Sequence, residues 1–292
     1  MSLASVLRLV LLAAIWGGSF LFMRLTANSL GPAVLIEGRV FAAALFLLLI
    51  SLYLGRTLLF TSHLKHFFII GAFNTALPFL MFAYAAQTLN ASTLAILNST
   101  APLFGAVIAS LWQKEPLKLK AGLGLLVGML GVSVLVGQHA MTLGEEGLLA
   151  ILACLLAAFM YGVSANYTKV APVVAPFENA HGSLWAAVII VLPLLPFMPI
   201  RDPITLPISM SVLALGIVCT GFAYLLYFRL VKDDGPASAL SVTFLVPLFG
   251  IVWGHLFLEE AIGLNTLLGA SLVIIGTILV TGFSFKKALK KR

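Results

Sequence analysis

The sequence contains very few charged residues. Only 9% of its 292 residues are Asp, Glu, Lys or Arg, whereas soluble domains average about 25%. Hydrophobic residues make up 61%, and the mean hydropathy is +1.12. Too little charge remains to cover the surface of a soluble domain. We therefore expect an integral membrane protein, embedded in the lipid bilayer and without an extramembrane domain.

Cysteine is scarce, and the motifs of common enzymes are missing. The only cysteines, Cys154 and Cys219, lie within apolar runs, so we assign them no redox role. The sequence has no His-Glu-x-x-His, no Gly-x-Ser-x-Gly, no phosphate-binding loop and no cluster of metal ligands. We expect neither enzyme activity nor a cofactor or metal. Basic residues nowhere combine with aromatic platforms, which argues against a nucleic-acid partner.

Turn and charge clusters divide the chain into ten apolar runs, each of roughly the 20 residues that a helical span needs. The runs cover residues 4–24, 33–54, 67–87, 91–112, 119–138, 147–167, 179–199, 208–230, 236–257 and 262–283. Short connections, such as 88–90, predict antiparallel neighbours. The expected fold class is all-α, with ten transmembrane helices.

Lysine and arginine are distributed unevenly between the two ends of these spans. When both termini are placed on the same side, all of the 17 basic residues except Arg24, Arg39 and Arg201 lie on that side or in its loops. Because Lys and Arg resist translocation, this side is expected to be cytoplasmic. The net charge of +7 then reflects membrane topology.

An internal repeat relates the two halves of the chain. Pro102-Leu103-Phe104-Gly105 recurs as Pro247-Leu248-Phe249-Gly250, at an offset of 145 (247 minus 102). The same offset pairs Gly17 with Gly162, Ser19 with Ser164, Thr75 with Thr220, Glu115 with Glu260, Gly124 with Gly269, Gly131 with Gly276 and Gly137 with Gly282. Five spans per half is an odd number, so the second half enters the bilayer in the opposite sense. We predict two inverted five-helix repeats, residues 1–140 and 141–285, followed by a basic cytoplasmic tail, 286–292. Inverted repeats favour transport by alternating access.

Several separated motifs resemble a known family. They are Trp16-Gly17-Gly18-Ser19-Phe20, Arg39-Val40-Phe41, and the stretch from Ala91 through Pro102 to Glu115 and Gly131, which recurs from Pro236 to Gly276. As an ordered set they resemble the EamA branch of the drug/metabolite transporter superfamily over nearly the whole chain. The resemblance implies ten helices, a central cavity lined by both halves, and efflux of small metabolites or amino acids across a bacterial inner membrane.

Two asparagine–proline pairs are candidates for binding the polar part of a solute. Asn74 and Pro78 share a helix face in the third span, and Asn98 and Pro102 repeat this arrangement in the fourth. Each proline removes one backbone donor and frees the carbonyl of the asparagine four residues earlier. The alternative is a hinge kink closed by the amide, or a hydrogen bond between helices.

Aromatic side chains near the middle of the spans are candidates for binding the apolar part of a solute. Their depth argues against the interfacial belts in which Trp and Tyr normally anchor helices. The aromatic set comprises Trp16, Phe79, Tyr161, Tyr224, Tyr227 and Phe244. Ser19 of the first motif is a further candidate for solute binding. Helix packing is the alternative role. Rings together with hydroxyl and amide groups suit amino acids and similar amphiphilic metabolites.

Glu37 and Arg39 are the charged residues of the second span, and we consider an electrostatic or gating role for them. Arg39 is expected to pair with a neighbouring group rather than to bind an anion. Glu37 lies on a different helix face near the outer end, where we expect it to be solvated. The equivalent positions of the second half, Gly182 and Leu184, are uncharged, so any such role belongs to one half.

The predicted function is that of a secondary transporter that moves small metabolites, amino acids or related amphiphilic solutes above all, by alternating access, with export as the expected direction. No acidic residue lies deep in a helix, which favours uniport or exchange over proton antiport and neutral or zwitterionic solutes over cations. The alternatives are a drug or organic-cation efflux carrier and, from another class, a channel or lipid-moving protein. Glycines that permit close helix packing, in a monomer or homodimer, are Gly122, Gly124, Gly128, Gly131, Gly269 and Gly276.

Overall fold

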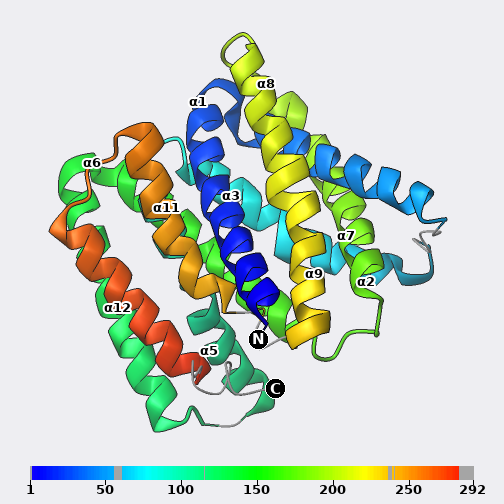
Figure 1. Cartoon of the computed structure of the whole chain (residues 1–292). Helices are drawn as coiled ribbons and strands as arrows, with labels where there is room; N and C mark the ends of the chain where they lie inside the picture. Colours follow the sequence, from blue (N-terminus) through cyan, green and yellow to red (C-terminus); the bar gives the residue numbers. More distant parts are fainter. Residues whose placement is uncertain (1, 56–60, 115, 236–238, 240, 283–292) are drawn as a thin grey trace.

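A computed structural model describes the chain except for residues 1, 56–60, 115, 236–238, 240 and 283–292. Its described residues form helices and connecting turns, with no strand (Figure 1). The helices are α1 (Leu3–Tyr53), η1 (Thr61–His63), α2 (Leu64–Ile70), η2 (Gly71–Ala76), α3 (Leu77–Ala85), α4 (Ala91–Asn98), α5 (Ala101–Gln113), α6 (Leu119–Tyr167), α7 (Pro176–Val191), η3 (Leu192–Phe197), α8 (Leu206–Leu213), η4 (Ala214–Phe222), α9 (Ala223–Asp234), α11 (Val242–Leu258) and α12 (Leu264–Thr281). The predicted tail, 286–292, lies outside the described residues.

Hydropathy and length identify seven helical segments of the described chain that could cross a membrane, along with two shorter apolar helices, Leu119–Leu135 and Val242–Leu258. Large apolar side chains cover the outside of the bundle, with Leu111 exposed at 70% and Phe257 at 65%. Such a surface suits lipid rather than water. The expectation of an all-helical membrane protein is confirmed, and Cys154 and Cys219 are buried free thiols within it.

Two of the helices bend sharply at a glycine. α1 contains 51 residues, about 75 Å at 1.5 Å per residue, more than twice the thickness of a bilayer core. Gly31 interrupts it with φ 70° and ψ 163°, a conformation that residues with a side chain rarely adopt, and Pro32 follows. Gly144, with φ 59°, interrupts α6 in the same way. Each long helix therefore consists of two arms that run in different directions (Figure 1).

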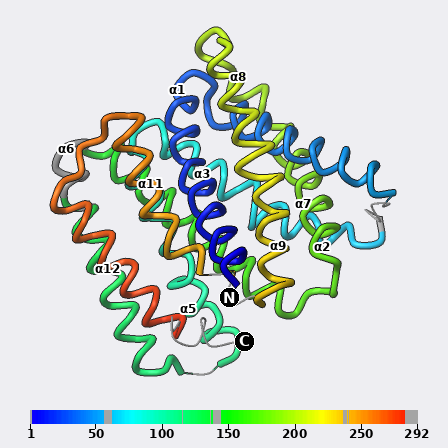
Figure 2. The backbone as a smooth tube through the Cα atoms, viewed as in Figure 1, coloured from blue at the N-terminus to red at the C-terminus, as the bar shows by residue number. Residues whose placement is uncertain are grey.

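Glycines bring α6 and α12 into close contact, and Figure 2 shows the two helices side by side. A Cβ atom on Gly124 would lie 2.7 Å from the carbonyl oxygen of Gly276. One on Gly131 would lie 2.9 Å from the carbonyl oxygen of Gly269. Both distances are shorter than real contacts of this kind, so only glycine fits. The predicted close packing thus occurs within one chain, whereas Gly122 faces open space.

Two π-helical segments, η2 and η4, occupy corresponding places in the two halves. Thr75 and Thr220, which the offset of 145 relates, lie one in each. In η4 the hydroxyl of Thr220 donates to the carbonyl of Leu215, five residues earlier, at 2.8 Å. Segments of this kind occur frequently at functional sites.

The fourth predicted span is broken after Asn98, whereas the residues equivalent to this break lie within the helix α11. Ser99 and Thr100 separate α4 from α5, and their hydroxyls donate to carbonyls three residues earlier, at 2.7 and 2.6 Å. Pro102 then lies in the first turn of α5, where its missing N–H costs no helical hydrogen bond. Pro247, the equivalent residue, lies within the continuous helix α11.

Candidate functional site

Arg39 is a buried cation in the second arm of α1, with only 4% of its surface exposed. Its Nε donates to the hydroxyl oxygen of Thr220 at 3.0 Å, and its Nη1 lies 3.7 Å from the sulfur of Met23. The guanidinium carbon lies 3.7 Å from the ring centre of Phe79. All three neighbours are neutral, so the expected structural pairing takes the form of a hydroxyl, a thioether and an aromatic face.

The local fold explains how Thr220 reaches Arg39. η4 packs closely on α1 because Gly216 has no side chain: a Cβ atom there would lie 2.7 Å from the carbonyl oxygen of Arg39. Thr220 follows one turn later. Its hydroxyl hydrogen is already engaged with the Leu215 carbonyl, so its oxygen is free to accept from Arg39.

Aromatic side chains continue from this cation toward the first arm of α1. Tyr161 and Tyr224 lie in the neighbourhood of Arg39, as Cys219 does, and the rings of Tyr224 and Tyr227 both contact that of Phe228, with ring centres 6.0 and 5.9 Å apart. The ring of Tyr227 lies 5.7 Å from that of Trp16. Trp16 and these three tyrosines are only half-buried although they lie inside the bundle, so their rings retain accessible surface. We call Arg39, Thr220, Phe79 and these four residues the central cluster.

Two buried rings pack against the central cluster at Tyr161. Phe82 stacks on Tyr161 with ring centres 6.3 Å apart, and Phe20 meets Phe82 edge-on at 5.6 Å. Phe20 and Phe82 are buried, at 5% and 1% exposure. The ring of Tyr161 therefore packs against a pair of buried aromatic side chains.

The remaining candidates from the sequence lie in other surroundings. The hydroxyl of Ser19 donates to the carbonyl of Trp16 at 2.7 Å, which engages its proton within α1. Asn74 and Asn98 are half-buried, and neither amide makes a hydrogen bond to another described residue. Both amides thus remain available to a solute, Asn74 from η2 and Asn98 from the end of α4.

Two further candidates belong to the packed interior. Pro78 lies in the first turn of α3, directly after η2, and is buried, and Phe244, in the first turn of α11, is only 6% exposed. Pro102 is half-buried. These residues position helices; their part in solute binding stays a prediction.

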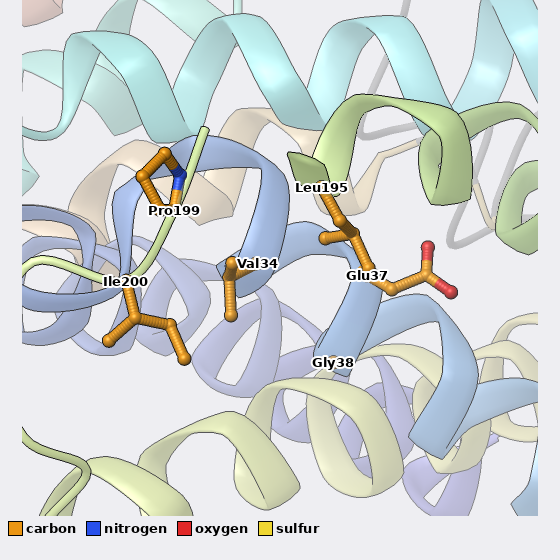
Figure 3. A pocket seen from close by; sticks show the side chains of 6 residues that line it. All are labelled: Val34, Glu37, Gly38, Leu195, Pro199 and Ile200. Carbon is orange, nitrogen blue, oxygen red and sulfur yellow. The ribbon is translucent and has the colours of Figure 1, made fainter. Parts of the chain in front are cut away.

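Glu37 lines a separate groove of about 420 Å³ between α1 and η3, together with Val34, Gly38, Leu195, Pro199 and Ile200. In Figure 3 its carboxylate points away from Val34, Pro199 and Ile200. The expectation of a solvated Glu37 is wrong for one oxygen, since Oε2 is buried and has no hydrogen-bond partner within the described chain. No ion pair joins Glu37 to Arg39 in that part of the chain.

Sequence patterns did not single out Met23 and Thr220 as neighbours of Arg39, or Phe82 as the ring against Tyr161. One signal was available, because Thr75 and Thr220 are polar residues at the same repeat position within apolar spans. The described residues hold no group of three or more His, Cys, Asp or Glu side chains placed to bind a metal ion.

Comparison with known proteins assigns the family. The profile of the EamA-like transporter family matches residues 3–137 and again residues 148–282. The chain is 25% identical to an uncharacterised transporter, YoaV, of Bacillus subtilis, over 97% of this chain and 98% of that protein. It is also 25% identical to protein PecM of Dickeya dadantii, over 83% and 82% of the two chains.

Two further likenesses concern an exporter and a crystal structure. A protein of Streptantibioticus cattleyicolor named as a probable terminal-alkyne amino-acid exporter is 25% identical, over 94% of this chain and 93% of its own. One crystal structure superposes with a TM-score of 0.62 at 17% identity, covering 95% of this chain and 97% of the other, which shows a shared fold. With apolar helices throughout and both halves matched by one profile, the chain is a multi-pass membrane transporter and belongs to the EamA-like transporter family.

Proposed function

We propose that the protein is a secondary carrier that exports small amphiphilic metabolites, amino acids above all, from the bacterial cytoplasm by alternating access. The central cluster is the observation that carries this proposal, because it joins a buried polar group to accessible aromatic rings inside a membrane transporter. A polar head and an apolar body on one small solute match these two parts.

We further propose that the helices form ten membrane spans in two inverted repeats, 1–140 and 141–285, with α1 and α6 each supplying two spans. The family profile supports this, since its two matches begin at residues 3 and 148, again 145 apart. The paired π-helical segments η2 and η4 agree with the same register. Such a carrier would hold its solute between the repeats, which exchange roles as the protein alternates.

Orientation in the inner membrane follows from the basic residues. α1 begins and α12 ends toward the same end of the molecule (Figure 1), which is consistent with both termini on one side. The Lys-rich and Arg-rich loops belong to that side, so we propose that it is cytoplasmic. All residues of the central cluster come from one chain, so a monomer, or each subunit of a homodimer, would contain a complete site.

The chemistry of the cluster favours amino acids over organic cations. A cationic drug would meet the like charge of Arg39 instead of the central carboxylate that cation carriers use. The relative named as an amino-acid exporter points the same way. A channel or lipid-moving protein is the alternative from another class, and saturation separates it from a carrier.

Counterflow in proteoliposomes tests the proposal. Purified protein is reconstituted, vesicles are preloaded with an unlabelled amino acid, nucleobase or organic cation, and entry of the labelled solute is followed with and without a pH gradient. Saturable, stereoselective counterflow of amino acids is expected. Flux that rises linearly with concentration would identify a channel, and saturable counterflow of cations alone would contradict the proposed substrate class.

A further inference from the structure

We propose that the guanidinium of Arg39 is the binding site for a single carboxylate group of the transported solute. This inference rests on the proposed carrier function and adds the group that is recognised and the residue that recognises it. Within the described chain Arg39 has no acidic partner, although only 4% of its surface is exposed.

The first step concerns charge. An arginine side chain stays protonated at any physiological pH, and an unpaired buried charge is costly to keep. The hydroxyl, thioether and ring around Arg39 offer partial compensation, but none carries a negative charge. Glu37, the closest acid in sequence, lies in the separate groove against η3. The positive charge of Arg39 is thus uncompensated within the described chain, and a solute anion would neutralise it.

The second step concerns donors. A guanidinium has five N–H groups, and a carboxylate accepts two of them side by side. Nε is engaged by Thr220, while Nη1 meets only the weak acceptor Met23 at 3.7 Å. Nη2 has no hydrogen-bond partner among the described residues. The Nη1 and Nη2 edge is therefore the part of Arg39 that can receive a carboxylate.

The third step concerns what lies around that edge. Tyr161 of α6 and Tyr224 of α9 lie in the neighbourhood of Arg39, and both are half-buried. Beyond them, Tyr227 and Trp16 face each other. A solute with its carboxylate at Arg39 would place an apolar or aromatic body against these rings. The expected ligand is a monocarboxylate with such a body, which includes α-amino acids.

The repeat limits the number of carboxylates to one. The position equivalent to Arg39 is Leu184, which is fully buried and apolar. Thr75 and Thr220 are by contrast the same residue in both halves. The hydroxyls are thus duplicated and the cation is not, so a dicarboxylate would leave its second charge without a partner.

Matched solutes test the carboxylate directly. Competition for labelled phenylalanine counterflow is measured for phenylalanine, 3-phenylpropionate, phenylalaninamide and phenethylamine, which share one ring and differ in their charged groups. Binding of the same four compounds to detergent-solubilised protein is followed by Trp fluorescence, so that the result does not depend on transport. The two carboxylates are expected to bind about 10- to 100-fold more tightly than the amide and the amine, as loss of a charge-assisted pair would predict.

Variants then assign the effect to Arg39. Arg39→Gln should remove the preference for carboxylates, and Arg39→Lys should retain part of it as a point charge. Thr220→Val keeps the cation but removes the acceptor that orients Nε, so we expect a smaller loss of the same preference. Lys120→Gln, an exposed position at the start of α6, removes one positive charge elsewhere and should change nothing. Arg39→Lys and Thr220→Val keep the test valid if Arg39→Gln does not fold.

The outcomes separate this inference from the proposed function. Saturable counterflow with no preference for carboxylates, or with the preference intact in folded Arg39 variants, would overturn the role of Arg39 and leave a carrier. If chloride alone binds the wild-type protein as tightly as 3-phenylpropionate does, Arg39 belongs to an inorganic-anion site. That result would also overturn its role as a carboxylate site. If none of the carboxylate probes binds, the role of Arg39 is likewise overturned. If no solute shows saturable flux, the proposed carrier function itself is contradicted.

Discussion

Glu260 is expected to hold the connection between α11 and α12 against the start of α4. Its carboxylate accepts hydrogen bonds from the backbone N–H groups of Ala91 at 2.6 Å and Ser92 at 3.1 Å, and from the Ser92 hydroxyl at 2.6 Å. The first N–H groups of a helix have no partner within the helix, and a negative charge there is favourable. One side chain therefore joins a loop of the second half to a helix of the first.

The magnitude follows from these three contacts. A hydrogen bond to a charged group contributes about 1.5–3 kcal/mol, and we take the lower end or less because Glu260 is half-buried. Glu260→Ala should then lower the free energy of unfolding by about 2–3 kcal/mol, or the Tm by roughly 4–10 °C. Glu260→Gln keeps an acceptor but loses the charge, so its effect should be intermediate.

Thermal unfolding in detergent, followed by Trp fluorescence, measures the effect. Glu259→Ala is the matched control, since Glu259 is the exposed neighbour in the same loop. A drop in Tm for Glu260→Ala that the control does not share would support the proposed stabilisation of the start of α4 by Glu260. Equal Tm values for the two variants would refute the reasoning and show that the three hydrogen bonds add nothing net.

The remaining predictions concern helix packing and solute binding. Gly124→Ala should lower the Tm, because its Cβ would lie 2.7 Å from the carbonyl oxygen of Gly276, whereas Gly122→Ala in the same helix should leave the Tm unchanged or raise it. Equal Tm values for the two variants would contradict the close contact. Trp16→Ala and Asn98→Ala should each raise the apparent Km for counterflow more than they lower the Tm. Unchanged Km values in both would remove these residues from the site.

The presence of apolar helices long enough to cross a bilayer was predictable, because hydropathy reports the length of chain that suits the bilayer core. Helix ends were less so: the first span was expected to stop at residue 24, yet α1 continues to the bend at Gly31. A helix can extend beyond the apolar run, and polar residues such as Asn28 and Ser29 then lie within it. Hydropathy marks membrane depth rather than the point at which helical hydrogen bonding stops.

The candidate site was predictable in its residue types and not in its contacts. A buried arginine is costly wherever it lies, so Arg39 could be singled out from sequence. Its neighbours Met23, Phe79 and Thr220 come from three separate elements, and only the packing of η4 on α1 brings the last of them within 3.0 Å. The π-helical turn that directs the hydroxyl of Thr220 has no signature in local composition.

The glycine contacts between α6 and α12 have a consequence for how the two halves could associate. A shift of 145 residues converts Gly124 into Gly269 and Gly131 into Gly276, so the contact of Gly124 with Gly276 becomes that of Gly269 with Gly131. The interface is therefore isologous, the arrangement by which two copies of one surface form a closed dimer. Two separate half-chains would possess everything that this contact requires, so the covalent link at the Gly144 bend is not what holds the halves together there.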